Sequence, residues 1–229
     1  MTTPPRNFGA RYGNSHSVSG LSWRDWLYTS DCFDRGLSRQ AWGSAYDIAT
    51  LSVGGGSNEV TSNVSRNTLI TGAVANNQEG TQIHDAVVVR SRQYYAEVEV
   101  ELTSVTAVEF RFGFYKDADE YAFIEFDKSL NDNWRLHIDD GSGAEFSTES
   151  LVVQADEDYF MAIWMELDGT PHWAIGASSY YDMVEMGTTG IANKVTADPH
   201  FLQWYVKTEE NVAKTAKIDY LRTYKTANH

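Results

Sequence analysis

The chain has 229 residues, of which 42% are hydrophobic and 13% aromatic, and its formal net charge at pH 7 is −14. That length fits one large β domain with an arm or two small domains, and the single cysteine, Cys32, excludes an intrachain disulfide framework and a thiolate zinc cluster. The acidic balance without a Lys/Arg cluster excludes a nucleic-acid-binding surface, and no apolar run is long enough to insert into a membrane.

The first 60 residues differ in character from the rest of the chain. Residues 1–20 are rich in Gly, Ser and Asn, which predicts an extended N-terminal arm without a core of its own. Residues 21–50 carry the aromatic side chains Trp23, Trp26, Tyr28 and Trp42, which could contact another copy of the chain or pack within it. Glycines 54–56 are a strong turn or linker signal. We therefore predict an attachment and assembly segment over residues 1–60 and one domain over 61–229.

Strand patterns dominate the second part. Apolar and acidic residues alternate over 96–102, which places the apolar side chains on one face of a strand and Glu97, Glu99 and Glu101 on the other. Similar segments recur, separated by turn residues, at 108–114, 121–126, 134–138, 159–167, 173–175, 201–207 and 217–224. So many strands in one open sheet would curl or split, and the pattern therefore predicts an all-β, two-sheet sandwich.

The three glutamates of the first strand invite a functional interpretation. Three carboxylates on one strand face could hold a cation, but such a row is more often a solvated, edge-protecting surface. No second matched carboxylate or metal motif accompanies them, and the six histidines are scattered without zinc-binding spacing. We therefore predict an acidic surface here, and neither a metal site nor a bound cofactor.

The closing segments, residues 201–206 and 213–221, resemble the end of concanavalin-like jelly-roll domains found in structural proteins of tailed viruses. An aromatic hairpin at 110–126, a Trp-bearing strand at 159–167 and a strand after the Asp168-Gly169 turn occur upstream in the order of that family. The resemblance covers about residues 90–225 and implies a jelly-roll sandwich. It also implies a virion structural protein: a capsid decoration, turret, fibre or tail component.

That role carries expectations about partners. Virus appendages sit on rotational axes, so a homo-oligomer, a trimer or pentamer, is expected together with other virion proteins and contact with cell-surface glycans. Only seven of the 18 basic residues are lysine, a balance typical of proteins in high salt, which points toward a haloarchaeal virus, although ordinary acidic proteins share it. The alternatives are a carbohydrate-binding module or, less favoured, a glycoside hydrolase or lyase on the same fold.

An enzyme on this fold would need a pair of carboxylates. The match to the strand motif of one β-glucanase family is Glu125 and Asp127, which share a face, but Lys128 and Ser129 stand where the second glutamate would follow. Retaining hydrolysis needs two carboxyl groups about 5 to 5.5 Å apart, and no partner lies at the motif spacing. The sequence therefore predicts no catalytic residue and no enzymatic activity.

A shallow ligand site is the remaining candidate. If the strands pair in chain order, Arg111, Glu125, Arg135 and His137 lie on one sheet face, with Tyr115 and Trp173 near its rim. Polar groups that orient hydroxyls, beside an aromatic plane that stacks on a ring, are typical of sugar sites. We therefore predict that these four residues bind a ligand.

Overall fold

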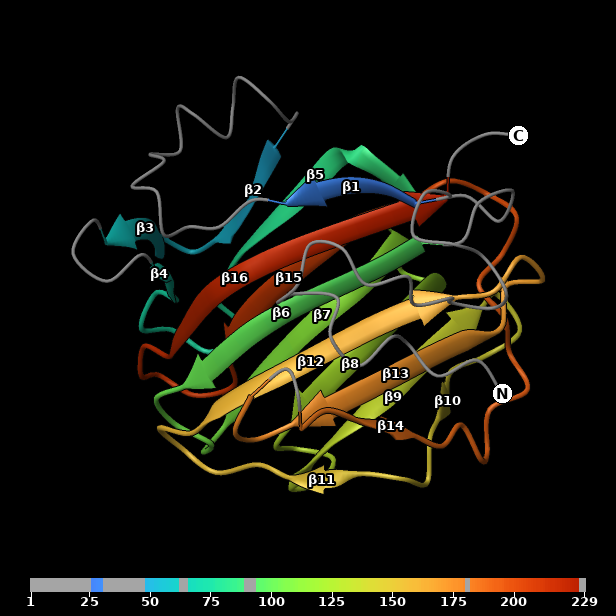
Figure 1. The fold of residues 1–229 in the computed structure, drawn as a ribbon. Helices are drawn as coiled ribbons and strands as arrows, with labels where there is room; N and C mark the ends of the chain where they lie inside the picture. The colour runs from blue at the N-terminus through green and yellow to red at the C-terminus, as the bar shows by residue number, and fades with distance from the viewer. Residues whose placement is uncertain (1–25, 31–47, 62–65, 89–93, 180–181, 227–229) are drawn as a thin grey trace.

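The computed structural model describes residues 26–30, 48–61, 66–88, 94–179 and 182–226 (Figure 1). The predicted arm over residues 1–20, Cys32, and the aromatic residues Trp23 and Trp42 lie outside these ranges. Among the described residues all regular elements are β-strands. No helix in that part of the chain has the length and apolar character needed to cross a membrane.

The strands form two antiparallel sheets that face each other (Figure 1). The first sheet has the order β14-β13-β12-β6-β16-β4-β3, with β1 also paired to β16. Its strands are β1 (Trp26–Ser30), β3 (Ser57–Thr61), β4 (Arg66–Ile70), β6 (Tyr94–Leu102), β12 (Asp158–Met165), β13 (Pro171–Gly176), β14 (Val184–Met186) and β16 (Thr215–Thr226).

The second sheet has the order β10-β9-β8-β7-β15-β5-β2, with β11 also paired to β9. Its strands are β2 (Ile48–Val53), β5 (Gln78–Val88), β7 (Val108–Asp117), β8 (Glu120–Asp127), β9 (Asn133–Asp140), β10 (Glu145–Phe146), β11 (Leu151–Val152) and β15 (His200–Thr208). The predicted all-β, two-sheet sandwich is confirmed, and each strand predicted from residue 96 onward overlaps an observed one.

Alternating side chains explain the core. The inner face of β6 carries Val98, Val100 and Leu102, and none of these side chains is exposed to solvent. From the second sheet, β7 contributes Phe110, Phe112 and Phe114 to the same hydrophobic cluster, and Trp134 and Trp204 complete its bulk. Burial of this much aromatic and aliphatic area is the main stabilising contribution to a domain of this size.

The triple glycine joins the two sheets. Gly54 and Gly55 have φ angles of +82° and +83°, and they turn the chain from β2 in the second sheet to β3 in the first. The Asn77 side chain donates a hydrogen bond to the Gly54 carbonyl at 2.7 Å, so the turn is held in place. Strands β1, β2 and β3 all lie within the first 61 residues. They pair with β16, β5 and β4, respectively, and so belong to the two sheets of the sandwich.

The predicted acidic surface on β6 is wrong for Glu97 and Glu101, whereas Glu99 is half-buried. Glu97 is 2% exposed and Glu101 is 8% exposed, although both lie on the outer face of their sheet as the alternation requires. The Tyr95 hydroxyl donates to Glu97 at 2.9 Å, and the Lys217 ammonium pairs with Glu101. These carboxylates are therefore buried and paired rather than solvated.

Candidate functional site

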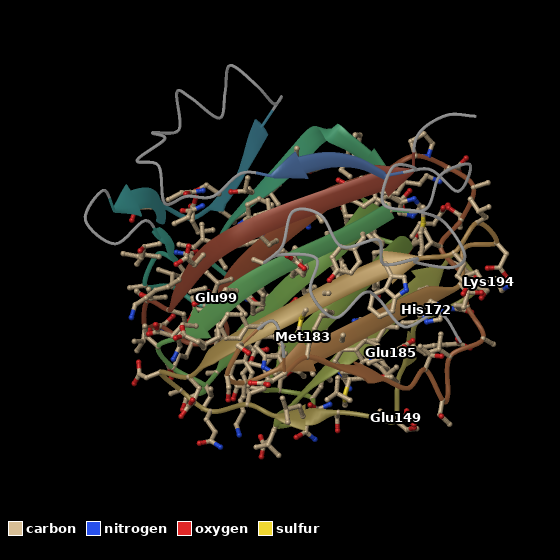
Figure 2. The ribbon with its side chains drawn as sticks, viewed as in Figure 1. Glu99, Glu149, His172, Met183, Glu185 and Lys194 are labelled. Atoms are coloured by element: carbon tan, nitrogen blue, oxygen red, sulfur yellow. The ribbon has the colours of Figure 1, made fainter. Side chains whose placement is uncertain are left out.

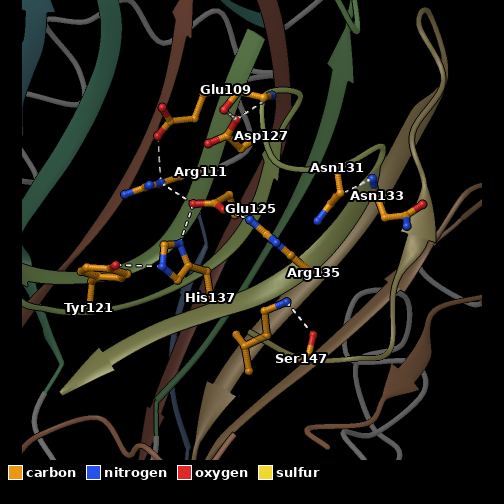
Figure 3. Close-up of polar contacts among 12 residues, drawn as sticks. Glu109, Arg111, Tyr121, Glu125, Asp127, Asn131, Asn133, Arg135, His137 and Ser147 are labelled. Carbon is orange, nitrogen blue, oxygen red and sulfur yellow. Dashed lines mark hydrogen bonds and ion pairs between the residues drawn. The ribbon is translucent and has the colours of Figure 1, made fainter. Parts of the chain in front are cut away.

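The outer face of the second sheet holds the predicted ligand-binding residues. The register sets Arg111 of β7 opposite Glu125 of β8, and Glu125 opposite Arg135 of β9. His137 lies two residues further along β9, on the same face, because strand side chains alternate. The structure brings all four residues into direct contact (Figure 3). That they bind a ligand remains a prediction.

Glu125 is the centre of this network. Its side chain is not exposed at all, and one carboxylate oxygen lies 2.7 Å from Arg111 Nε and 2.7 Å from His137 Nδ1. The other oxygen accepts a hydrogen bond from Arg135 Nη2 at 3.1 Å. Burial opposes ionisation, but the hydrogen bonds and the positive charge of Arg111 outweigh it and lower the pKa of Glu125 to about 2.

Arg111 is held at one end and open at the other. Its Nε lies 2.9 Å from a Glu109 oxygen as well as 2.7 Å from Glu125. Burial disfavours the charged form, yet the phenol of Tyr205 and the two carboxylates attract it and raise the pKa of Arg111 above its usual value. In Figure 3 the terminal nitrogens point away from both glutamates, and no hydrogen bond or ion pair within the described part of the chain engages them.

Aromatic rings surround the two arginines. The Arg111 guanidinium lies 5.6 Å from the ring centres of Tyr121 and Phe123, and the Arg135 guanidinium lies 3.8 Å from the ring centre of Phe146. Such cation–π contacts orient a guanidinium without consuming its N–H donors. The face therefore combines unengaged donors with aromatic rings, of which Tyr115 and Phe146 are partly exposed and Tyr121, Phe123 and Tyr205 are buried.

His137 links the polar network to these rings. Its Nε2 lies 2.8 Å from the Tyr121 hydroxyl, and its ring stacks on Phe146 with 4.1 Å between the ring centres. Burial raises the pKa of Tyr121 to about 12, against the attraction of Arg111. Tyr121 therefore stays a neutral phenol at physiological pH.

The two rim residues predicted from sequence have different outcomes. Tyr115 does lie on this face, where its ring stacks on Phe123 with 6.2 Å between the ring centres. The placement of Trp173 is wrong: it belongs to β13 of the first sheet and is completely buried in the core between the sheets. Its indole Nε1 donates to the Gly187 carbonyl at 3.2 Å, which fixes it there.

Strand β15 adds residues that the sequence interpretation missed. It pairs with β7, so Gln203, Tyr205 and Lys207 project onto the same outer face as Arg111. The Tyr205 hydroxyl donates to Glu109, and the Lys207 ammonium lies 2.7 Å from the other Glu109 oxygen. Burial and the charge of Glu109 raise the pKa of Tyr205 well above its usual value. Alternation within residues 201–207 would have placed these side chains together, but not beside β7.

One group of carboxylates could hold a cation. Oxygens of Glu109, Asp127 and Glu209 lie within 4.8 Å of one another. Burial, followed by repulsion from Asp127, raises the pKa of Glu209. Arg111 and Lys207 already supply positive charge to Glu109. Protein side chains thus compensate much of the charge that a metal ion would neutralise.

The geometry disfavours Glu125 as a catalytic acid. A general acid needs a raised pKa and a proton to donate, whereas the pKa of Glu125 is lowered to about 2. Both of its oxygens also face cationic or N–H partners, which leaves no oxygen directed toward a substrate. The residue is better suited to orienting the arginines.

The outer face of the first sheet carries a second, smaller cluster, formed by Tyr95, Ala162, Trp164 and Ala174 with Met183 at its edge. His172 stacks on Trp164 with 5.3 Å between the ring centres, and its Nδ1 lies 3.0 Å from Glu185. Figure 2 shows His172, Met183 and Glu185 on this face. The indole of Trp164 is 4% exposed, so the cluster offers little ring surface to a ligand.

Comparisons with known proteins support the fold. No family model and no characterised protein sequence matches the chain. Among solved structures, a protein of unknown function from Shewanella oneidensis is 15% identical, with a TM-score of 0.60 over 88% of this chain and 87% of that one.

Two further matches are lectin domains. The metal-free carbohydrate recognition domain of Emp46p is 8% identical, with a TM-score of 0.56 over 86% of this chain and 97% of that one. The Lotus tetragonolobus seed lectin is 8% identical, with a TM-score of 0.54 over 80% and 94%. The sandwich is therefore a lectin-like, concanavalin-type jelly roll, as predicted, and these identities show the fold alone.

Proposed function

We propose that the protein is a non-enzymatic carbohydrate-binding protein and that sugars bind on the outer face of β7, β8, β9 and β15. The observation that carries the proposal is the set of terminal N–H groups of Arg111, which no described residue engages and which lie beside the rings of Tyr121, Phe123 and Tyr205. The lectin domains that share the fold support it at the level of architecture.

The chemistry of the face suits a sugar. A pyranose presents hydroxyl oxygens, which accept hydrogen bonds from guanidinium N–H groups, and C–H surfaces, which pack on aromatic rings. Glu109 and Glu125 hold Arg111 through Nε, so its donors are positioned before a ligand arrives. Such preorganisation reduces the entropy lost on binding.

A titration tests this function. Isothermal calorimetry with cellohexaose, laminarihexaose, mannohexaose and galactotetraose should give a dissociation constant in the millimolar range or tighter for at least one of them. Arg111→Lys keeps the charge but removes the planar fork, and should weaken that binding about tenfold. Lys194→Ala is the control, because Lys194 is exposed and its ammonium pairs with Asp168 of the turn between β12 and β13.

Two results of these titrations would contradict sugar binding at this face. No heat of binding with any of the four sugars at millimolar concentration, or equal affinity in Arg111→Lys and the unaltered protein, would contradict the proposal. Thermal unfolding of each variant establishes that it is folded before its affinity is interpreted.

The role in a virus particle and the trimeric or pentameric assembly are further proposals, which rest on the resemblance of residues 201–206 and 213–221. Light scattering of the full chain, and of a chain lacking residues 1–60, measures the assembly directly. If the full chain and the shortened chain are both monomers, an assembly role for the N-terminal segment is contradicted.

A further inference from the structure

Gln203 carries a buried oxygen that has no hydrogen-bond donor among the described residues. It lies in the middle of β15, opposite Gly113 of β7 and Gln82 of β5, on the outer face that holds Arg111. The residue is 4% exposed, and its Oε1 accepts no hydrogen bond within the described part of the chain. A buried amide oxygen without a donor is unfavourable for folding, so a partner for Oε1 from outside the described chain, a water molecule or a ligand, is expected.

The neighbours of Gln203 leave room for a role in binding. Gly113 contributes no side chain at the position directly opposite, and a Cβ added there would lie 2.2 Å from the Ala122 carbonyl oxygen of β8. Arg111 is the next residue of β7 on this face, and its side chain is 21% exposed with unengaged terminal nitrogens. Rotation of the Gln203 side chain, a common kind of change on binding, would turn Oε1 from its buried position toward a ligand on this face.

The charges on this face favour a neutral ligand. Three basic side chains, Arg111, Arg135 and Lys207, lie on this face with three acidic ones, Glu109, Glu125 and Asp127. A fourth acid, the half-buried Glu209, lies beside Glu109 and Asp127. A carboxylate or sulfate on a ligand would add an uncompensated negative charge to a chain that already carries −14.

From these observations we propose that Gln203 is a specificity residue that accepts a hydrogen bond from a hydroxyl of a neutral sugar, while Arg111 donates to a neighbouring hydroxyl oxygen. A hydroxyl group both donates and accepts, so one vicinal pair satisfies Gln203 and Arg111 together. An acidic group would satisfy Arg111 but would offer no proton to Gln203. The inference rests on the proposed sugar-binding function and adds the ligand class and a second contact.

The test is the variant Gln203→Met, of similar size and without the amide. Its affinity for the neutral sugar that the unaltered protein binds should fall about tenfold, while its melting temperature stays the same or rises, because an unsatisfied polar group has been removed. A residue with a purely structural hydrogen bond would show a lower melting temperature. Gln82→Met is the matched control: it lies on the same face, and its affinity should change less than twofold.

Oligogalacturonate and a heparin hexasaccharide are titrated beside the neutral panel. Binding of the neutral sugar alone, weakened about tenfold in Gln203→Met, supports the inference. Equal affinity of Gln203→Met and the unaltered protein, or tighter binding of the acidic sugars, overturns it while leaving sugar binding intact. Absence of any sugar binding by the unaltered protein instead overturns the proposed function itself.

Discussion

Replacement of Glu125 by glutamine tests the polar network on which the site depends. Glu125→Gln keeps the shape of the side chain but removes the charge that Arg111, Arg135 and His137 surround at 2.7–3.1 Å. A pKa displaced from 4.5 to about 2 corresponds to about 3 kcal/mol of folding free energy at pH 7. Loss of one member of a buried ionic network has a similar effect, about 3–5 kcal/mol.

The sign of the pH dependence follows from the lowered pKa. Glu125 contributes fully above pH 4.5, its value in the unfolded chain, and the contribution is lost as the pH falls toward about 2. About half of the 3 kcal/mol should therefore remain at pH 3. The difference between Glu125→Gln and the unaltered protein should shrink accordingly.

Urea unfolding followed by tryptophan fluorescence, at pH 7 and pH 3, measures both effects. Glu157→Gln is the control, since Glu157 is exposed and its replacement should change the free energy of unfolding by less than about 0.5 kcal/mol. A loss below about 1 kcal/mol in Glu125→Gln at pH 7, or an equal loss at the two pH values, would refute the assigned network.

Three further substitutions test the architecture. Gly113→Ala should lower the free energy of unfolding by about 1–3 kcal/mol in thermal denaturation, because φ is +155° and a Cβ would lie 2.2 Å from the Ala122 carbonyl oxygen; an unchanged melting temperature would contradict this backbone. Phe110→Ala should lower it by about 3–5 kcal/mol in urea, since Phe110 is fully buried; a loss under about 1 kcal/mol would count against the core. Arg135→Lys should lower it by about 1 kcal/mol through lost stacking on Phe146, and no change in urea unfolding would argue against that contact.

The sequence was most informative where one physical rule decided the outcome. Alternation over 96–102 and 108–114 predicted strands and their core faces, and adjacency in the chain was enough to place Arg111, Glu125, Arg135 and His137 together. Strands β7, β8 and β9, which carry these four residues, pair in chain order through short turns, so their register follows from local geometry.

Long-range pairing was the part that sequence could not supply. Strand β15 reaches β7 across about 90 residues, so the placement of Tyr205 and Gln203 beside β7 had no local signal. Strands β3 and β4 lie in a Ser/Thr/Asn-rich stretch and pair at the end of their sheet, where polar composition conceals the strand pattern. Glu97 and Glu101 were misplaced in solvent because alternation assigns a face but does not reveal what pairs with it.

A crystal structure of the protein soaked with the neutral oligosaccharide that binds it tightest would show directly which face of the sandwich binds sugar. The sugar is expected on the outer face of β7, β8, β9 and β15, with its hydroxyls within hydrogen-bond distance of Arg111 Nη and Gln203 Oε1. A sugar bound instead on the outer face of β6, β12 and β13, or at the loops beyond the strand ends, with Arg111 and Gln203 untouched, would contradict this site.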